Sequence, residues 1–250
     1  MNFIKKVKLS LATILLFSVS SFAQMDLTMP VNRMVYQRNQ QNTATIYVGG
    51  SFSGQLEKIE ARLTTLDGTG NPKSPLEQSA WLVLLNNPTK GNFLAPISNV
   101  KGGWYQLEVR AIQKGAQIGN LSTIKVGVGE VFSIAGQSNA QGERSDRLDF
   151  YYGAKDDRVN CVNLQDFSLI NPFKYPEISH LESQSFLAPT GKNSHCWGPL
   201  GDLISKNWGV PVIFFNAAVG GSSVIQWRAG ATYTTTEKDN SQFKFYFTKG

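Results

Sequence analysis

A serine follows a short apolar stretch in an arrangement that could make it a nucleophile. Val131–Ala135 is mostly apolar and predicts a buried strand, Gly136 breaks that strand, and Ser138 follows two residues later. The small and polar residues after Ser138 can open a helix. A strand, a tight turn and a helix in this order lift a serine hydroxyl out at the carboxyl end of a sheet, where it can attack a carbonyl carbon. Capping the helix is the alternative role for Ser138.

A pair of glycines follows another predicted strand. Val210–Val219 is rich in β-branched and aromatic residues, and it leads into Gly220-Gly221-Ser222-Ser223. Ligands of open parallel sheets bind outside the carboxyl ends of the strands, and glycines there let backbone N–H groups approach a ligand closely. An N–H aimed at the oxyanion that forms during acyl transfer lowers the barrier by ~3 kcal/mol. A tight turn is the alternative role for the glycines, but the order and spacing of the two motifs favour a site.

The elements between these motifs indicate a parallel sheet with helices on its faces. Arg158–Leu164 predicts a further strand, and the apolar residues of Trp197–Trp208 recur at helical spacing until Gly209 ends the pattern. Continuous apolar strands that alternate with a helix are typical of parallel pairing. Residues 165–195 predict a loop, which is either functional or a solvated insertion.

The first part of the mature chain predicts an all-β domain. Thr43–Val48, Ile59–Leu63 and Trp104–Arg110 alternate apolar and polar residues, and Trp81–Leu85 is a further short apolar run. Turn signals separate these stretches, which favours a small β-sandwich over residues 24–128, followed by a second domain over 129–250. We interpret Trp104 as a core anchor, with a sugar-binding platform as the alternative.

Residues 1–23 have the parts of a secretory signal peptide. Three lysines precede the apolar Leu9–Val19, and Ser21-Phe22-Ala23 supplies the small residues for cleavage after Ala23. The apolar run is shorter than the ~20 residues that cross a bilayer, which argues against a membrane anchor. No later segment of the sequence is long and apolar enough to span. We therefore expect a secreted or periplasmic protein.

The charge of the chain does not indicate a nucleic-acid partner. The formal net charge is +6, and it falls to +3 when the three leader lysines are removed. No basic run with interleaved aromatic residues occurs after residue 30. Nothing in the sequence indicates an oligomeric state.

Two cysteines allow one intramolecular disulfide. Export permits disulfide formation, and Cys161 and Cys196 are the only cysteines. The compartment favours a bridge between them, with two free thiols as the alternative.

The two motifs together resemble a known family. Gly136-Gln137-Ser138-Asn139, followed by Ala218–Ser223 and Trp227, is similar to the SGNH hydrolase superfamily and, within it, to the sialate O-acetylesterase-like carbohydrate esterases. The resemblance covers roughly residues 128–228. Ala140 stands where the elbow of α/β-hydrolases has its second glycine, so the spacing differs from Gly-x-Ser-x-Gly. The resemblance implies an α/β fold class: a β-sandwich followed by an incomplete, flavodoxin-like, three-layer α/β/α domain.

The resemblance also implies roles for matching residues. Ser138 would be the nucleophile, and the N–H groups of Ser138 and Gly221 would form the oxyanion hole, with Gly220 the less favoured donor. Gln137 and Asn139 would shape the turn with Gly136. The implied reaction removes O-acetyl groups from a glycan, so the chain would be a carboxylic ester hydrolase that acts on an O-acetylated carbohydrate. It would need no metal and no other cofactor.

The sequence departs from the family in lacking a catalytic base. The family carries a later Gln-Gly-Glu block and an Asp-x-x-His whose histidine activates the serine. The only histidines here are His180 and His195, and neither lies in an Asp-x-x-His. We therefore expect the chain to be the N-terminal part of a longer esterase, inactive and poorly stable alone.

Two other functions remain open from the sequence. A non-catalytic carbohydrate-binding protein would keep the pocket and bind sugars through Trp104 or Trp227. An unrelated serine hydrolase would use His195 as its base. Arg228 could meet the carboxylate of an acidic sugar, although a surface or turn role is the simpler interpretation.

Overall fold

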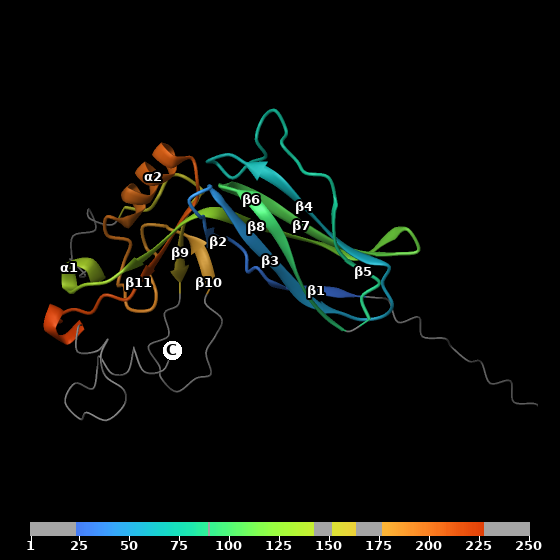
Figure 1. Ribbon diagram of the computed structural model, residues 1–250. Helices are drawn as coiled ribbons and strands as arrows, with labels where there is room; N and C mark the ends of the chain where they lie inside the picture. The colour runs from blue at the N-terminus through green and yellow to red at the C-terminus, as the bar shows by residue number, and fades with distance from the viewer. Residues whose placement is uncertain (1–23, 90, 143–151, 164–176, 228–250) are drawn as a thin grey trace, which may run out of the picture.

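The computed structural model describes residues 24–89, 91–142, 152–163 and 177–227. This part of the chain is mostly β-sheet with few helices, and the strand-rich N-terminal half lies beside a smaller half that holds the helices, including a helical turn at 224–227 (Figure 1). The elements are β1 Met25–Met29, β2 Met34–Gln37, β3 Thr43–Phe52, β4 Lys58–Leu66, β5 Leu82–Asn86, β6 Asn92–Lys101, β7 Gly103–Gln113, β8 Ala116–Ile134, α1 Ser138–Gln141, β9 Val159–Asn163, β10 Glu177–His180, α2 Trp197–Trp208 and β11 Val212–Asn216.

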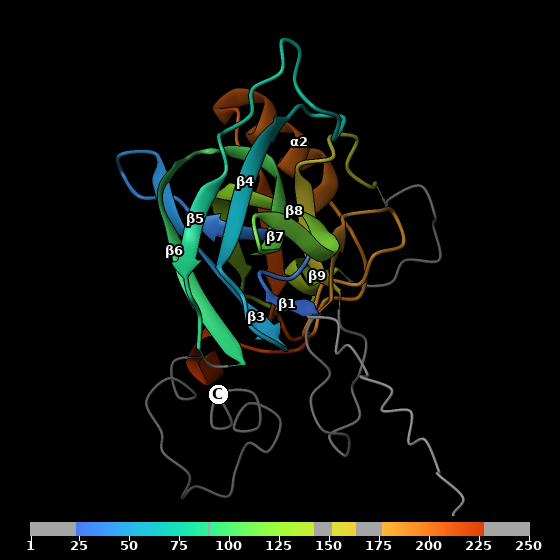
Figure 2. The ribbon, with the colours of Figure 1, turned by 90° about the vertical axis from the view of Figure 1, so that its right-hand side faces the viewer.

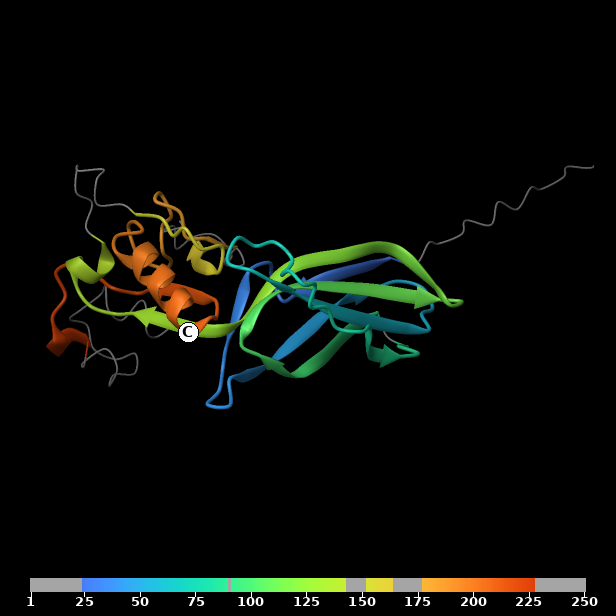
Figure 3. The same ribbon diagram turned by 90° about the horizontal axis from the view of Figure 1, so that it is seen from above.

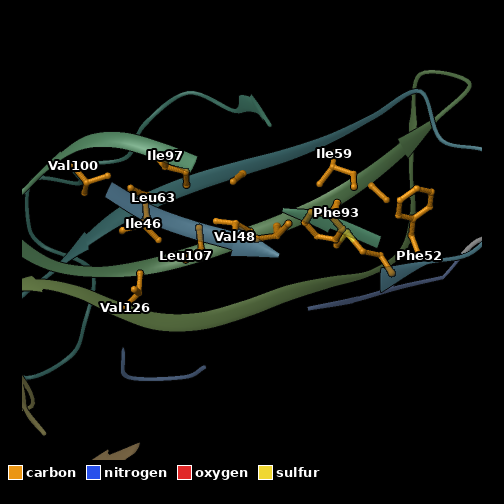
Figure 4. Close-up of a cluster of buried hydrophobic side chains, with 14 of the residues drawn as sticks. Ile46, Val48, Phe52, Ile59, Leu63, Phe93, Ile97, Val100, Leu107 and Val126 are labelled. Atoms are coloured by element: carbon orange, nitrogen blue, oxygen red, sulfur yellow. The ribbon is translucent and has the colours of Figure 1, made fainter. Parts of the chain in front are cut away.

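The N-terminal half consists of two facing sheets. One sheet has the order β1-β3-β6, and the other includes the run β8-β7-β4-β5 (Figure 2). The side chains between them form one apolar core, in which Ile46, Val48 and Leu107 are fully buried (Figure 4). The alternation along Thr43–Val48 therefore does bury its apolar face. This burial of apolar area is the main force that holds two sheets together.

Strand β8 runs through both halves of the molecule. Up to Val128 it pairs antiparallel with β7, and from Glu130 it pairs in parallel with β11 (Figure 3). Strand β2 pairs with it in parallel along Val126–Gly129. The border expected between residues 128 and 129 falls inside this continuous strand, so the two halves share one backbone ladder.

The second half is built on three parallel strands. Strand β11 lies between β8 and β9, and β10 adds an antiparallel strand at the edge. Helix α2 has the bounds expected from its spacing, and it packs on one face of these strands. Gly201 lets the helix approach closely, because a Cβ added to it would lie 2.4 Å from Val159 Cγ1, and Trp197 and Ile204 pack on the same buried cluster. The larger residues Leu203 and Trp208 stay exposed.

The three-layer α/β/α arrangement is not confirmed by the described residues. Helix α2 covers one face, where Val159 and Phe214 are buried. On the opposite face, Ile213 packs in a cluster with Trp104 and Ala188, so the sandwich and a loop cover it instead of a helix. A second helical layer stays a prediction.

A carboxylate joins the two halves. The carboxylate of Asp157, just before β9, accepts hydrogen bonds from three side chains. These are Lys125 Nζ of β8 at 2.7 Å, Trp104 Nε1 of β7 at 2.9 Å and Arg33 Nη1 of the β1–β2 connection at 3.0 Å. Arg33 Nε also donates to Asn160 Oδ1 at 2.7 Å. Trp104 is only 1% exposed, which confirms it as a core anchor and rules it out as a sugar platform.

The surroundings of Asp157 stabilise its charged form. Burial raises the pKa of this carboxyl, but hydrogen bonds from Lys125 and Trp104 and the charge of Arg33 outweigh burial, so the pKa is lowered. A carboxylate whose pKa is lower in the folded than in the unfolded state stabilises the fold above about pH 4, the unfolded pKa. That contribution disappears as the pH falls through the folded pKa.

We predict that Asp157→Asn lowers the free energy of unfolding near neutral pH by roughly 2–3 kcal/mol, because Arg33 and Lys125 are left without a counter-charge. Below about pH 4 the difference should shrink, since the wild-type carboxylate becomes protonated. Urea unfolding at both pH values measures this. Asp26→Asn is the control, since Asp26 is exposed and its carboxylate bonds only Gln24 among the described residues. Equal effects of the two substitutions would contradict the assignment.

Candidate active site

Ser138 is the first residue of α1 and follows the end of β8 after a tight turn. Gly136 has φ +149°, in the region that favours glycine, and a Cβ there would lie 2.9 Å from Ala140 Cβ. The Gln137 carbonyl accepts the amides of Ala140 and Gln141, each at 2.9 Å, which closes the single turn of α1. Ser138 is half-buried, whereas Gln137 and Asn139 are exposed. The strand, turn and helix order expected from the sequence is thus observed.

The glycine pair lies beside Ser138. Because β11 pairs directly with β8, the segment after β11 emerges next to the serine turn. A Cβ added to Gly220 would lie 3.8 Å from Ser138 Cβ. The Gly220 N–H donates to Gln141 Oε1 at 3.0 Å, so it is already engaged. Gly221 has φ +76°, and its N–H donates to no acceptor within the described part of the chain.

Polar side chains fix the two motifs to each other. Asn216, which is fully buried, donates from Nδ2 to the Ala140 carbonyl at 2.8 Å and accepts the Ala218 amide at Oδ1. Gln141 Nε2 donates to the Thr190 carbonyl at 2.8 Å. Sequence reasoning assigned no role to Gln141 or Thr190. An asparagine that ends an apolar strand is the one local signal that could have indicated Asn216.

The indole of Trp227 is anchored to the glycine pair's segment. Its Nε1 donates to Ser222 Oγ at 2.9 Å, and Ser222 Oγ lies 2.6 Å from the Val219 carbonyl and 3.3 Å from the Gly136 carbonyl. Trp227 is half-buried. Trp227 is thus connected through Ser222 to the turn that holds Ser138. The expectations for Arg228, for the leader at 1–23 and for residues 164–176 lie outside the described residues.

Neither histidine is bonded to Ser138 in the described structure. His180 in β10 has both ring nitrogens on backbone carbonyls, Nδ1 on Val159 at 2.9 Å and Nε2 on Ala154 at 3.1 Å. His195 lies nearer the site, since a Cβ added to Gly142, after α1, would be 3.4 Å from its Cβ. Its Nδ1 is buried without a partner among the described residues. A base of a triad is instead oriented by a carboxylate at Nδ1.

The expected disulfide does not form. Both cysteines are free, with Cys161 buried in β9 and Cys196 exposed directly before α2. Cys161 Sγ lies 3.6 Å from Ser179 Oγ of β10. Burial raises the pKa of both thiols, which disfavours the reactive thiolate. Compartment alone could not reveal this separation.

The described residues contain no group of three metal-ligating side chains, and none of their helices is long and apolar enough to cross a membrane. No protein-family model and no curated protein matches the chain.

Solved structures resemble parts of the chain. A carbohydrate acetylesterase from Xanthomonas citri aligns at 20% identity and a TM-score of 0.46, over 82% of this chain and 43% of its own. A chitin binding domain from Burkholderia pseudomallei aligns at 9% identity and a TM-score of 0.28, over 38% and 56% of the two chains. A superoxide reductase from Ignicoccus hospitalis aligns at 9% identity and a TM-score of 0.26, over 43% of this chain and 82% of its own. The chain thus spans less than half of the acetylesterase, and these TM-scores establish neither its fold nor its activity.

We predict that Gln141→Glu lowers the free energy of unfolding by about 1–2 kcal/mol, because a carboxylate can accept from Gly220 but cannot donate to the Thr190 carbonyl. Chemical denaturation measures the change. Gln137→Glu makes the same replacement on an exposed side chain of the same turn and should stay within ~0.5 kcal/mol of wild type. If both variants matched the wild type, Gln141 would not connect the two motifs.

Proposed function

We propose that the chain carries the nucleophile of a secreted carbohydrate esterase that removes O-acetyl groups from glycans, as the sialate O-acetylesterase-like enzymes do. The observation that carries the proposal is the distance of 3.8 Å between Ser138 Cβ and a Cβ added to Gly220, because it puts the glycine pair against the serine. The resemblance of the two motifs supports the acetyl ester as substrate. Export follows from the expected cleavage near Ala23.

In the proposed reaction, the Ser138 hydroxyl attacks the carbonyl carbon of the acetyl ester. The oxyanion that forms accepts hydrogen bonds from the N–H groups of Ser138 and Gly221. The Gly220 N–H is less suited to this task, because Gln141 Oε1 already accepts it. The sugar oxygen leaves as a hydroxyl after a base passes it the proton of Ser138, and water then hydrolyses the acetyl-serine to acetate and the free serine.

The reaction needs a base, and the two histidines of the sequence are poorly suited. Both ring nitrogens of His180 lie on carbonyl oxygens, and His195 has no carboxylate at Nδ1 among the described residues. Serine without a base is a weak nucleophile near neutral pH. We therefore propose that a histidine from outside these 250 residues supplies the base, in an Asp-x-x-His as in the family.

The lack of a suitable base also favours a second candidate, a carbohydrate-binding protein without catalysis. Trp104 is buried and cannot serve as its sugar platform. Trp227, half-buried beside the glycine pair's segment, is the remaining aromatic candidate of the two that the sequence offered.

Activity measurements separate these candidates. We predict that the full product of the gene hydrolyses 4-nitrophenyl acetate and O-acetylated glycans, and that Ser138→Ala reduces kcat by at least about a thousandfold, because the acyl-serine cannot form. Ser133→Ala is the control, since Ser133 is an exposed serine of β8, the strand that precedes the turn of Ser138. The 250-residue chain alone should show no Ser138-dependent turnover.

Two results would redirect the proposal. Binding of acetylated glycans without turnover, weakened by Trp227→Ala, would support the binding protein. Turnover by the 250-residue chain that His195→Gln abolishes, with the fold intact, would identify His195 as the base of a different serine hydrolase.

A further inference from the structure

The glycine pair lies in a turn that Ser222 closes twice. The Ser222 amide donates to the Val219 carbonyl at 3.2 Å, so Val219–Ser222 form a four-residue turn with the glycines at its two central positions. The φ of +76° at Gly221 is typical of the third position of a type II turn. The Ser222 hydroxyl lies 2.6 Å from the same Val219 carbonyl. Ser222 therefore holds this turn, called the glycine turn below, through its backbone and through its side chain.

The glycine turn is bonded to the loop that carries Ser138. The Val219 amide donates to the Gly136 carbonyl at 2.9 Å, and Ser222 Oγ lies 3.3 Å from that carbonyl. Gly136 is the residue at which the chain turns from β8 toward Ser138. The two turns of the candidate site thus share one hydrogen-bonded junction, and the Ser222 side chain is part of it.

Trp227 determines where the proton of the Ser222 hydroxyl points. A hydroxyl oxygen can accept a hydrogen bond while its single proton is donated, whereas an indole N–H can only donate. Trp227 Nε1 donates to Ser222 Oγ at 2.9 Å, so the hydroxyl proton is directed away from the indole. The Val219 carbonyl is the nearer of the two carbonyls that can accept it. The indole therefore favours the hydrogen bond that closes the glycine turn.

The Gly221 N–H depends on this turn for its direction. It donates to no acceptor within the described part of the chain, and a Cβ added to Gly221 would meet no atom within 4 Å. A misplacement of a catalytic group by about 1 Å can cost on the order of a hundredfold in rate. The contacts that hold the glycine turn therefore decide how well this N–H meets an oxyanion.

We propose that Ser222 is a positioning residue for the oxyanion hole. Its hydroxyl, oriented by Trp227, holds the glycine turn so that the Gly221 N–H meets the oxyanion that forms on the ester carbonyl. Ser222 acts through Gly221 and takes no part in bond making or breaking. The inference rests on the proposed acyl transfer to Ser138 and adds the side chain that fixes its oxyanion donor.

Ser222→Ala in the full product of the gene tests the proposal. The substitution removes the hydroxyl and keeps the backbone hydrogen bond to Val219. We expect kcat for 4-nitrophenyl acetate to fall roughly tenfold to a hundredfold, less than or similar to the loss of a whole oxyanion donor, with KM changed by no more than about twofold. Ser222→Thr keeps the hydroxyl and should retain the wild-type kcat within about threefold.

The neighbouring serine supplies a matched control. Ser223 is exposed, and its Oγ accepts the Gln226 amide at 3.3 Å, outside the glycine turn. Ser223→Ala makes the same replacement one residue away and should leave kcat and KM at their wild-type values.

A thiono ester separates positioning from a loss of folded enzyme. In 4-nitrophenyl thionoacetate the negative charge develops on sulfur, which is a weak hydrogen-bond acceptor and gains less from the Gly221 N–H. Ser222→Ala should therefore lower the ratio of kcat for the oxygen ester to kcat for the thiono ester by roughly tenfold. Partial unfolding would lower both rates by the same factor and leave this ratio unchanged.

The proposal is wrong if Ser222→Ala retains the wild-type kcat or the wild-type ratio of the two rates. It is also wrong if Ser222→Thr is as slow as Ser222→Ala, or if Ser223→Ala has the same effect. Any of these results, with turnover that still depends on Ser138, would leave the proposed esterase activity standing. A wild type without Ser138-dependent turnover would instead contradict the proposed function, and this inference with it.

Discussion

A partly buried carboxylate holds the two halves of this molecule together. Asp157 accepts Lys125, Trp104 and Arg33 from three separate segments of the sandwich half, while its own segment leads into β9. Each of these donors would be costly to bury without a partner, because a desolvated charge or N–H loses its water. The cluster therefore fixes β9 against the sandwich, and β11 and α2 follow because they pack on β9.

The continuous strand β8 connects this junction to the candidate site. One end of the strand belongs to the sandwich ladder with β7, and the other end pairs with β11. This pairing brings Ser138, at the end of β8, beside Gly220, beyond the end of β11. Asn216 and Gln141 then fix the two turns with side-chain hydrogen bonds. A serine and glycines far apart in sequence thus share one edge because two strands are neighbours.

Local patterns predicted the elements well, and long-range contacts badly. The bounds of α2 and the position of the serine turn followed from spacing and from one glycine, which are local signals. The apolar spacing of α2 predicted its buried face in part, since Trp197 and Ile204 pack on the core, whereas Leu203 is exposed and Gly201 makes a close contact with the sheet. Strand β10 lay hidden in a stretch expected to be loop. No local pattern could predict the ion pair of Arg33 with Asp157 or the absence of a bond between Cys161 and Cys196. Both features depend on how distant segments pack.

The central claim is that Ser138 forms an acyl-enzyme. Its most direct test is mass spectrometry of the full gene product, quenched in acid shortly after mixing with an acetyl ester. We predict one added acetyl group, located by peptide mapping on Ser138. Turnover without any acetylated peptide, or with the acetyl group on another residue, would contradict it.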